Sequence, residues 1–217
     1  MSMLRVSEIF HSIQGEGSRA GLPCVFVRLH GCGLRCVWCD TPYALDHRSG
    51  GEEMDVEHIL HRVAAWNCDF VEVTGGEPLE QEGSFDLLTR LCDAEYTVAV
   101  ETGGHVDISR VDSRVIVIMD LKAPGSGMAK RNRFGNLDYL KSGDEVKFVL
   151  ASREDYEWAR ATVREHALTE RCGVLFSPVF STLAPRDLAQ WVLEDGLRLR
   201  MQLQMHKFIW DPDARGV

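Results

Sequence analysis

Short apolar runs alternate with amphipathic stretches along most of this 217-residue chain. The runs are rich in Val, Ile, Leu and Phe, as is typical of strands that are buried on both faces. Several stretches between them repeat apolar residues at helical spacing, and Asp55 before the first of these predicts an N-cap. The predicted strands are 4–10, 23–29, 70–73, 96–100, 115–119, 145–150, 174–176 and 200–205. The predicted helices are 56–66, 84–92, 154–166 and 187–193, with a short helix inside the glycine-rich segment 124–143.

This order of elements predicts an α/β fold. Strands that alternate with helices form a mostly parallel sheet with helical crossovers. Only about six or seven strands are expected to run parallel, which is too few for a closed eight-stranded barrel. We therefore expect a partial TIM-like β/α barrel. Since no repeat or linker divides the chain, we expect residues 1–217 to form a single domain.

Polar and glycine-rich residues gather after the carboxyl ends of the predicted strands. They include 74–77, 101–104, Lys122, Ser177 and His206. In barrels and open α/β sheets, this edge is where active sites are built. The pattern therefore predicts an enzyme whose site lies at one edge of the sheet.

Charge argues against some classes of partner. The chain has 24 Lys and Arg against 33 Asp and Glu, a net charge of −9, so we expect no non-specific nucleic-acid binding. A basic group at Lys130, Arg131 and Arg133 is interpreted as a solvated loop. No apolar run approaches the roughly 18 residues of a membrane span, so we expect no membrane partner.

The seven cysteines are an odd number, and the N-terminus has no apolar signal segment. Both features are typical of cytoplasmic thiols and not of a disulfide framework. Four of the cysteines lie in or beside apolar runs, where a free cysteine acts as a small core residue. These four are Cys24, Cys68, Cys92 and Cys172.

The other three cysteines, Cys32, Cys36 and Cys39, have a C-x3-C-x2-C spacing on one short loop. Three thiolates so close together suit a metal ion or a cluster, and they leave one coordination position open. One interpretation is a zinc site completed by His30 or His47, and a second is a [4Fe–4S] cluster with one open iron. Incidental clustering is the third. Spacing alone does not separate zinc from the cluster.

The cysteine loop carries Trp38 before its third cysteine, and Gly-Gly-Glu-Pro follows one strand later at 75–78. This combination resembles the radical S-adenosylmethionine (SAM) superfamily. In that superfamily the open iron is chelated by SAM, and the Gly-Gly-Glu-Pro loop contacts the amino group of SAM. The resemblance implies that Cys32, Cys36 and Cys39 hold a [4Fe–4S] cluster.

Further segments resemble one family within it, the 7-carboxy-7-deazaguanine synthases. They are the Ile-Phe-x-Ser-Ile-Gln-Gly-Glu-Gly opening at 9–17, the Cys-Asp-Thr at 39–41, and the segments 74–78, 100–102 and 204–208. The family converts 6-carboxy-5,6,7,8-tetrahydropterin to 7-carboxy-7-deazaguanine and ammonia, on the route to queuosine. It uses SAM as a regenerated cofactor, with assistance from Mg2+. The resemblance also implies a homodimer and a flavodoxin-type reductant.

The resemblance assigns roles to individual residues. Thr41 occupies the Mg2+ position, where a hydroxyl oxygen suits a hard cation. Glu16, Glu101 and His206 are candidates for binding the guanidine-like edge of the substrate or for moving protons. The implied substrate contacts are Ile13, Gln14, Gly15, Arg28, Thr74 and Pro212. The implied SAM contacts are Trp38, Cys39, Asp40, Gly76, Asp120, Leu121, Lys122, Ser177, Pro178, Val179 and Phe180.

Several of these residues have structural alternatives. Arg28 could instead form a surface ion pair. Glu101 and Thr102 could cap the next segment, and His206 could be an ordinary histidine at a strand end. For the whole chain, the alternatives are a radical SAM activase that makes a glycyl radical on a partner, another small radical SAM enzyme, or a non-catalytic Fe–S or zinc module.

Overall fold

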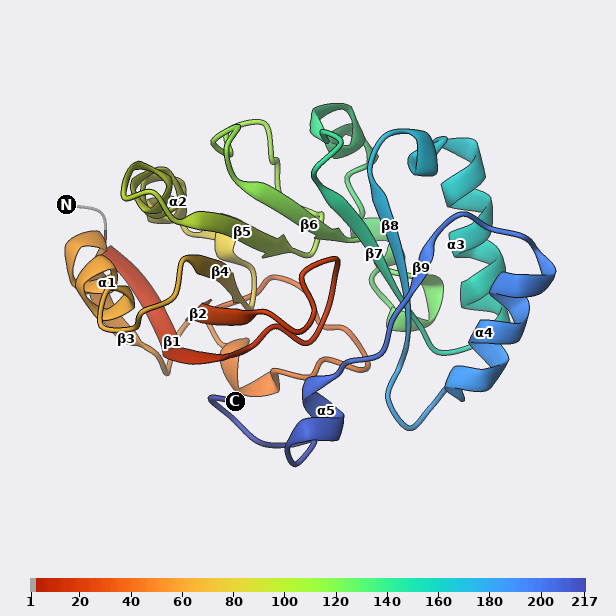
Figure 1. Cartoon of the computed structure of the whole chain (residues 1–217), viewed down its shortest axis with the longest axis horizontal. Coiled ribbons are helices and arrows are strands. Elements are labelled where there is room, and N and C mark those ends of the chain that lie inside the picture. Colours follow the sequence, from red (N-terminus) through yellow and green to blue (C-terminus); the bar gives the residue numbers. More distant parts are fainter. Residues whose placement is uncertain (1–2) are drawn as a thin grey trace.

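The structure, a computed structural model that describes residues 3–217, contains one nine-stranded sheet in the order β3-β1-β2-β4-β5-β6-β7-β8-β9 (Figure 1). β1 pairs antiparallel with β2 and β3, and the remaining neighbours pair parallel. Since β3 and β9 are the two ends of the sheet, it does not close, and the predicted partial barrel is confirmed. The strands are β1 (Met3–Ile13), β2 (Pro23–Leu29), β3 (Glu52–Asp55), β4 (Phe70–Gly75), β5 (Thr97–Thr102), β6 (Ile116–Asp120), β7 (Glu145–Leu150), β8 (Gly173–Pro178) and β9 (Arg200–Met201).

Helices connect the strands at both ends of the sheet. In Figure 1, α1 and α2 lie beside β1 to β5, and α3 and α4 lie beside β7 to β9. The amphipathic pattern explains this packing, because α1 buries Val56, Ile59 and Val63 against the core. The Asp55 side chain accepts a hydrogen bond from the His58 backbone N–H, which confirms the predicted N-cap. The helices are α1 (Val56–Val63), α2 (Gly83–Asp93), α3 (Arg153–Glu165), α4 (Pro185–Glu194) and α5 (His206–Ile209).

The two faces of the sheet differ in chemistry because side chains alternate along each strand. On β4, Val71 and Val73 are fully buried in the large core shared with the helices. Glu72 and Thr74 of the same strand line the inner cavity. Burying one such valine in the core stabilises the fold by roughly 1.5–3 kcal/mol, so the outer face carries the stability and the inner face is left for chemistry.

Some predicted boundaries were wrong. β1 extends to Ile13 and absorbs residues expected in the following loop, because Ile13 pairs with Pro23 of β2. α1 ends at Val63 and not at residue 66. Strand β3 was not predicted, and in the segment 124–143 the expected short helix is replaced by three 310 turns, Pro124–Ser126, Ala129–Arg131 and Phe134–Tyr139.

The last predicted strand was also wrong. It was expected over 200–205, but β9 pairs only through Arg200 and Met201. The chain then turns toward the 14–17 loop, where the Met205 backbone N–H donates to the Gly15 carbonyl over 3.0 Å. His206 therefore begins the short helix α5 and does not end a strand.

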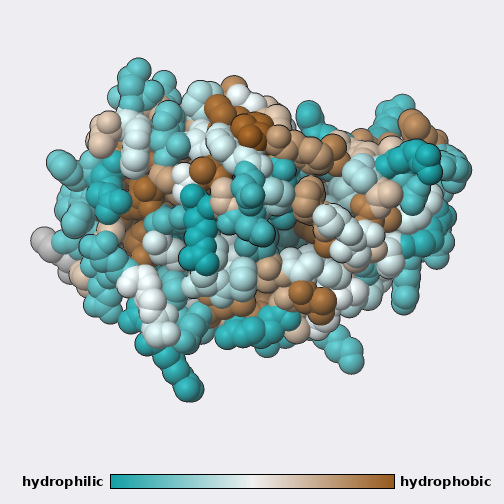
Figure 2. Space-filling view, turned by 90° about the horizontal axis from the view of Figure 1, so that it is seen from below, coloured by the Kyte–Doolittle hydropathy of each residue, from teal (hydrophilic) through white to brown (hydrophobic). Residues whose placement is uncertain are grey.

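The C-terminal segment runs from β9 across the open side of the curved sheet (Figure 1). Its far end reaches the turn that follows the cysteine loop, where the Arg215 guanidinium lies 3.9 Å from the centroid of the Tyr43 ring. On the face seen from below, apolar residues form small separate patches between hydrophilic ones (Figure 2). The segment thus links β9 to the turn that follows the cysteine loop.

Candidate active site

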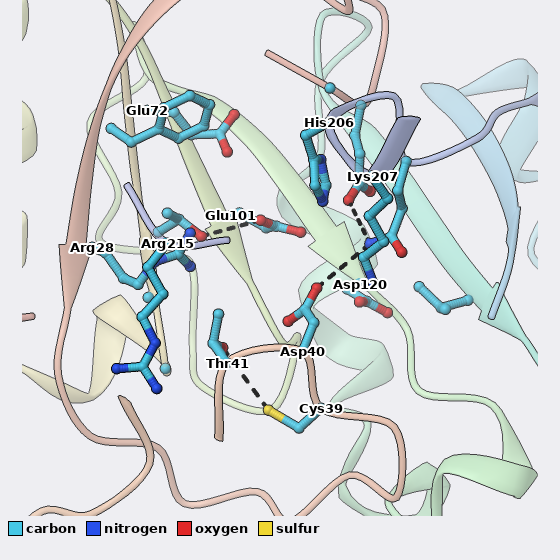
Figure 3. A pocket seen from close by; sticks show the side chains of 18 of the residues that line it. Arg28, Cys39, Asp40, Thr41, Glu72, Glu101, Asp120, His206, Lys207 and Arg215 are labelled. Atoms are coloured by element: carbon cyan, nitrogen blue, oxygen red, sulfur yellow. Dashed lines mark hydrogen bonds between the residues drawn. The ribbon is translucent and has the colours of Figure 1, made fainter. Parts of the chain in front are cut away.

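A cavity of about 570 Å3 lies at the carboxyl ends of the parallel strands, where the polar segments were predicted to meet. Figure 3 shows side chains from distant parts of the sequence around this one space, among them Arg28, Cys39, Glu101 and His206. Most residues named from the sequence line it. These are Ile13, Gln14, Gly15, Glu16, Arg28, Cys32, Cys36, Trp38, Cys39, Asp40, Thr41, Thr74, Gly76, Glu101, Asp120, Lys122, Val179, Phe180, His206 and Pro212.

Leu121, Ser177 and Pro178 do not line the cavity. All three are buried, and Leu121 packs in the large core. The cavity wall is formed instead by their neighbours Asp120, Lys122 and Val179. A SAM contact by these three residues therefore stays a prediction.

Backbone hydrogen bonds hold the cysteine loop in place. The Cys32 N–H donates to Leu45 over 3.3 Å, and the Val37 N–H donates to Ser126 over 3.1 Å. All three cysteines of the loop are free thiols that face the cavity. The loop is thus held at its first cysteine and again between the second and third, while its sulfur atoms stay available.

The donor set fits an iron–sulfur cluster better than a single zinc ion. Within residues 3–217, no three His, Cys, Asp or Glu side chains are arranged to hold one metal ion. The two histidines proposed to complete a zinc site have other partners: His30 contacts Ser7 Oγ and the Ser49 carbonyl, each at 2.8 Å, and His47 contacts Glu80. In a cluster each thiolate binds a different iron, so the sulfur atoms need not meet at one point.

Burial raises the pKa of the Cys32 thiol to about 11, and it also raises the pKa of Cys36. Cysteine binds metal as the thiolate. Binding of a cluster by this loop must therefore release protons.

The glycines of the Gly75-Gly76 turn are needed for packing against the cysteine loop. A Cβ at Gly75 would collide with Leu29, and a Cβ at Gly76 would collide with the Gly31 carbonyl. The Glu77 N–H donates to that same carbonyl over 2.8 Å. The turn is thus packed directly against the loop that carries the cysteines.

The Glu77 side chain points away from the cavity and fixes this turn. Its carboxylate accepts from the Leu79 N–H, the Gly103 N–H and the Thr102 hydroxyl over 2.7–3.1 Å. Burial nevertheless raises the pKa of this carboxyl group. Thr102 Oγ1 accepts in turn from the Gly104 N–H over 3.3 Å, a contact of the kind that the capping alternative for Glu101 and Thr102 requires. These contacts assign Glu77 the task of setting the geometry of the turn.

Asp120 provides an acceptor suited to a polar ligand. Its Oδ2 atom lies 2.9 Å from Lys122 Nζ, while its Oδ1 atom is buried and has no hydrogen-bond partner in the described part of the chain. A buried acceptor without a partner is unfavourable unless a ligand satisfies it. The position therefore fits a ligand that brings hydroxyl or amine donors, such as SAM.

Asp40 and Thr41 place oxygen atoms beside the third cysteine (Figure 3). Thr41 Oγ1 lies 3.9 Å from Cys39 Sγ, and the Asp40 side chain is exposed at the cavity rim. Mg2+ commonly takes only one or two ligands from a protein and completes its shell with water and substrate oxygens. The residues present fit such a site.

The 14–17 loop is rigidly held. The Gln14 amide is committed on both sides, since its Nε2 donates to Glu72 and its Oε1 accepts from the Glu16 N–H over 3.0 Å. Gly15 allows close contact with His206, because a Cβ at Gly15 would collide with the His206 ring. Burial lowers the pKa of His206, so its imidazole is neutral at pH 7 and can accept a proton.

Lys147 joins two of the predicted catalytic carboxylates. Its Nζ donates to Glu16 over 2.9 Å and also to Glu101. Thr74 Oγ1 donates to the other Glu101 oxygen over 3.1 Å. Burial alone would raise the pKa of Glu101, but the charge and hydrogen bond of Lys147 outweigh it and lower the pKa to about 2. Glu101 is therefore ionised and fixed in place.

Arg28 forms an ion pair inside the cavity wall. Its Nε donates to Glu8 over 2.8 Å, and the Tyr43 hydroxyl donates to the same Glu8 oxygen over 2.7 Å. The two terminal nitrogens of Arg28 have no hydrogen bond to residues 3–217, so they remain for a carboxylate. Both interpretations of Arg28, ion pair and anion binding, are compatible with this geometry.

Sequence reasoning missed Lys147, Glu72, Glu8, Tyr43 and Arg215, all of which line the cavity. For Lys147 and Glu72 there was a signal, because each is a charged residue in the middle of an apolar strand. For Glu8 and Arg215 there was none, since their positions depend on strand pairing and on the course of the C-terminal segment.

Comparisons with known proteins agree with this geometry. A family model described as the Radical SAM superfamily matches residues 26–119. The chain is 51% identical to 7-carboxy-7-deazaguanine synthase of Chlorobaculum tepidum over 99% of this chain and 97% of that relative. It is 43% identical to the enzyme of the same name from Koribacter versatilis, over 99% of this chain and 100% of that relative. The crystal structure of QueE from Escherichia coli matches with a TM-score of 0.78 at 20% identity, covering 94% of this chain and 95% of that one, which shows that the fold is shared.

Proposed function

The chain belongs to the 7-carboxy-7-deazaguanine synthase family of the radical SAM superfamily, and we infer from this that it converts 6-carboxy-5,6,7,8-tetrahydropterin to 7-carboxy-7-deazaguanine and ammonia. This is a step of queuosine biosynthesis. Membership of this family argues against the two alternatives considered from the sequence, a glycyl-radical activase and a non-catalytic metal module. The observation that carries the assignment is the convergence of the three-cysteine loop, the Gly75-Gly76 turn and the 14–17 loop on one cavity.

We propose that Cys32, Cys36 and Cys39 hold a [4Fe–4S] cluster and that Asp120 and the Gly76 backbone bind SAM beside it. Bound together, the cluster and SAM supply the hydrogen-abstracting radical chemistry of the superfamily. The chain supports this chemistry by excluding solvent: Leu34 is buried beside Cys32, and the half-buried Trp38 lies beside Cys39. Low polarity around a cluster tunes its potential.

The charges around the cavity suit a pterin that carries a carboxylate. Arg28 and Arg215 lie together on one side of the cavity, away from Glu101 (Figure 3). Glu16 lines the same cavity and shares Lys147 with Glu101. A guanidinium binds a carboxylate well, and carboxylates bind the N–H donors of a guanidine-like ring edge. We propose that Arg28 binds the substrate carboxylate and that Glu16 and Glu101 face the nitrogen-rich ring.

Ring contraction with loss of ammonia requires proton transfers, and three groups are placed for them. His206 is neutral and faces the cavity from α5, where it can accept a proton. Glu16 and Glu101 line the same cavity, where Lys147 holds both side chains by ion pairs. Thr41 is proposed to hold Mg2+ together with the substrate carboxylate, because both offer hard oxygen ligands.

The remaining proposals concern the setting of the enzyme. We propose one radical SAM domain over 1–217, a homodimer, a flavodoxin-type reductant and a cytoplasmic location, with no nucleic-acid or membrane partner. An exposed apolar pair on α5, Phe208 and Ile209, supports contact with a second copy. No helix within residues 3–217 is long and apolar enough to cross a membrane.

The proposed function is tested by anaerobic product analysis. Reconstituted protein is incubated with dithionite, SAM, Mg2+ and 6-carboxytetrahydropterin, and products are identified by mass spectrometry. We expect 7-carboxy-7-deazaguanine from the wild type and none from Cys36→Ala, which should also lose its complement of about four iron atoms per chain. Reductive SAM cleavage by the wild type without this product would contradict the proposal.

A further inference from the structure

The cavity contains a buried carboxyl group, Glu72, that none of the roles above uses. Glu72 lies two residues before Thr74 on β4, and alternate residues of a strand face the same side of a sheet. Both side chains therefore point into the cavity, and Figure 3 shows the Glu72 carboxylate facing the same space as Glu101 and His206. Glu72 as a whole is only 3% exposed.

The neighbours of Glu72 on the adjacent strands are apolar. Its neighbours in the sheet register are Phe26 of β2 and Ala99 of β5, and both belong to a small hydrophobic cluster on the inner face. Burial raises the pKa of Glu72 well above its usual range, and the nearby Glu101 carboxylate adds to this. An acid at such a position is destabilising unless its hydrogen bonds are satisfied. In a binding cavity, such a position indicates a functional requirement.

The two oxygens of Glu72 are used differently. Oε2 accepts a hydrogen bond from Gln14 Nε2, and Gln14 is held in turn by the Glu16 backbone. Oε1 has no hydrogen-bond partner in the described chain. Oε1 is not sealed from solvent, so it is open to the cavity. The carboxyl group is thus fixed on one side and free to bind a ligand on the other.

We propose that Glu72 is a specificity-determining residue that binds the exocyclic amine and the adjacent ring N–H of the aminopyrimidinone ring. This inference rests on the proposed function and adds a contact that the family motifs do not include. These two groups are donors that lie side by side, and the free Oε1 of Glu72 has two lone pairs that can accept from them while Oε2 stays with Gln14. The ligand's donors favour the ionised form of Glu72, which burial disfavours in the empty cavity. A 2-oxo analogue, in which a carbonyl oxygen replaces the exocyclic amine, would place an acceptor against the carboxylate. Glu72 therefore selects pterins with a 2-amino group over their 2-oxo analogues.

The test measures binding and not turnover. Dissociation constants are determined by anaerobic calorimetry for 6-carboxytetrahydropterin and its 2-oxo analogue, with reconstituted, SAM-loaded, unreduced enzyme. We expect the wild type to bind 6-carboxytetrahydropterin about 10- to 100-fold more tightly, because in the analogue a donor–acceptor contact with Glu72 Oε1 is replaced by an acceptor–acceptor contact. In Glu72→Gln one acceptor becomes a donor, so the preference should fall to within about threefold or reverse.

Two further variants make the result decisive. Glu145→Gln changes an equally buried glutamate at 3% exposure on β7, outside this cavity, and should keep the wild-type preference. Glu72→Val suits the apolar surroundings and should lose the preference if Glu72→Gln fails to fold.

Three outcomes would overturn the inference. If both ligands weaken equally in Glu72→Gln and Glu72→Val, Glu72 only holds Gln14. If the preference survives both changes, another residue selects the amine. A wild type that forms product without preferring 6-carboxytetrahydropterin contradicts the role of Glu72 alone, whereas a wild type that neither binds the pterin nor forms product contradicts the proposed function as well.

Discussion

Replacing Lys147 by Met should destabilise the protein by about 3 kcal/mol at pH 7. Lys147 is buried with 6% of its side chain exposed, and it is the cation between Glu16 and Glu101. The pKa of Glu101 lies at about 2, against about 4.3 for an unperturbed glutamate. At about 1.36 kcal/mol per pH unit, the interaction of this one carboxylate is worth about 3 kcal/mol. Breaking a buried ion pair generally costs about 3–5 kcal/mol, which agrees.

The pH dependence of this effect has a definite sign. A carboxylate whose pKa is lowered by folding contributes stability above its unfolded pKa of about 4.3, and this stability is lost as the pH falls toward 2. The difference between wild type and Lys147→Met should therefore be constant above about pH 5 and shrink below it.

The assay is urea unfolding followed by circular dichroism at several pH values under reducing conditions. Lys130→Met, which removes an exposed lysine, is the control and should change stability by less than about 0.5 kcal/mol. Adding Glu101→Gln to Lys147→Met should restore part of the loss, because the unpaired charge is removed. A Lys147→Met protein as stable as the control variant, or a loss that does not shrink at low pH, would refute the ion-pair argument.

Three other predictions test separate parts of the site. Gly76→Ala should reduce reconstituted iron from about four atoms per chain to below one, because the added methyl group collides with the Gly31 carbonyl. The control Gly135→Ala, whose methyl group meets nothing within 4 Å, should keep its full iron content. Equal iron in both variants would refute the packing argument. Arg28→Lys should weaken substrate binding about 10-fold or more in calorimetry, because an ammonium cannot pair with Glu8 and a carboxylate as a guanidinium fork can; an unchanged affinity would show that the carboxylate binds elsewhere. Burial holds the pKa of His206 below its usual value of about 6.5, so protonation of His206 opposes folding. The free energy of unfolding should therefore decline as the pH falls below about 6.5, and His206→Gln should flatten this decline. Identical profiles of stability against pH in the two proteins would exclude His206 as the source.

Strands with strong local signals could be predicted to the residue. β2 and β7 begin and end where expected, at Pro23–Leu29 and Glu145–Leu150, because each is an apolar run bounded by turn residues. β9 was overestimated because its continuation is decided by tertiary contacts. Gln202 and Gln204 leave the sheet to donate hydrogen bonds to Glu16, a residue more than 180 positions earlier in the chain.

The candidate site shows the same limit. Its motif residues converge on one cavity as predicted, because they follow strands whose carboxyl ends share an edge. The partners of those residues could not be predicted. Glu8 reaches Arg28 only through the antiparallel register of β1 and β2, and Lys147 reaches Glu101 across an intervening strand, β6. Charged residues within apolar strands, such as Glu72, are the one signal that would have revealed more of the cavity.

The most direct test of the assigned function is anaerobic turnover with SAM at one tenth of the substrate concentration. The substrate carries deuterium on the carboxylate-bearing ring carbon, and product and recovered SAM are followed by mass spectrometry. If the cavity binds cluster, SAM and pterin together and regenerates SAM, several equivalents of 7-carboxy-7-deazaguanine should form per SAM, and deuterium should appear in the recovered SAM. Stoichiometric consumption of SAM with no 7-carboxy-7-deazaguanine would contradict the account.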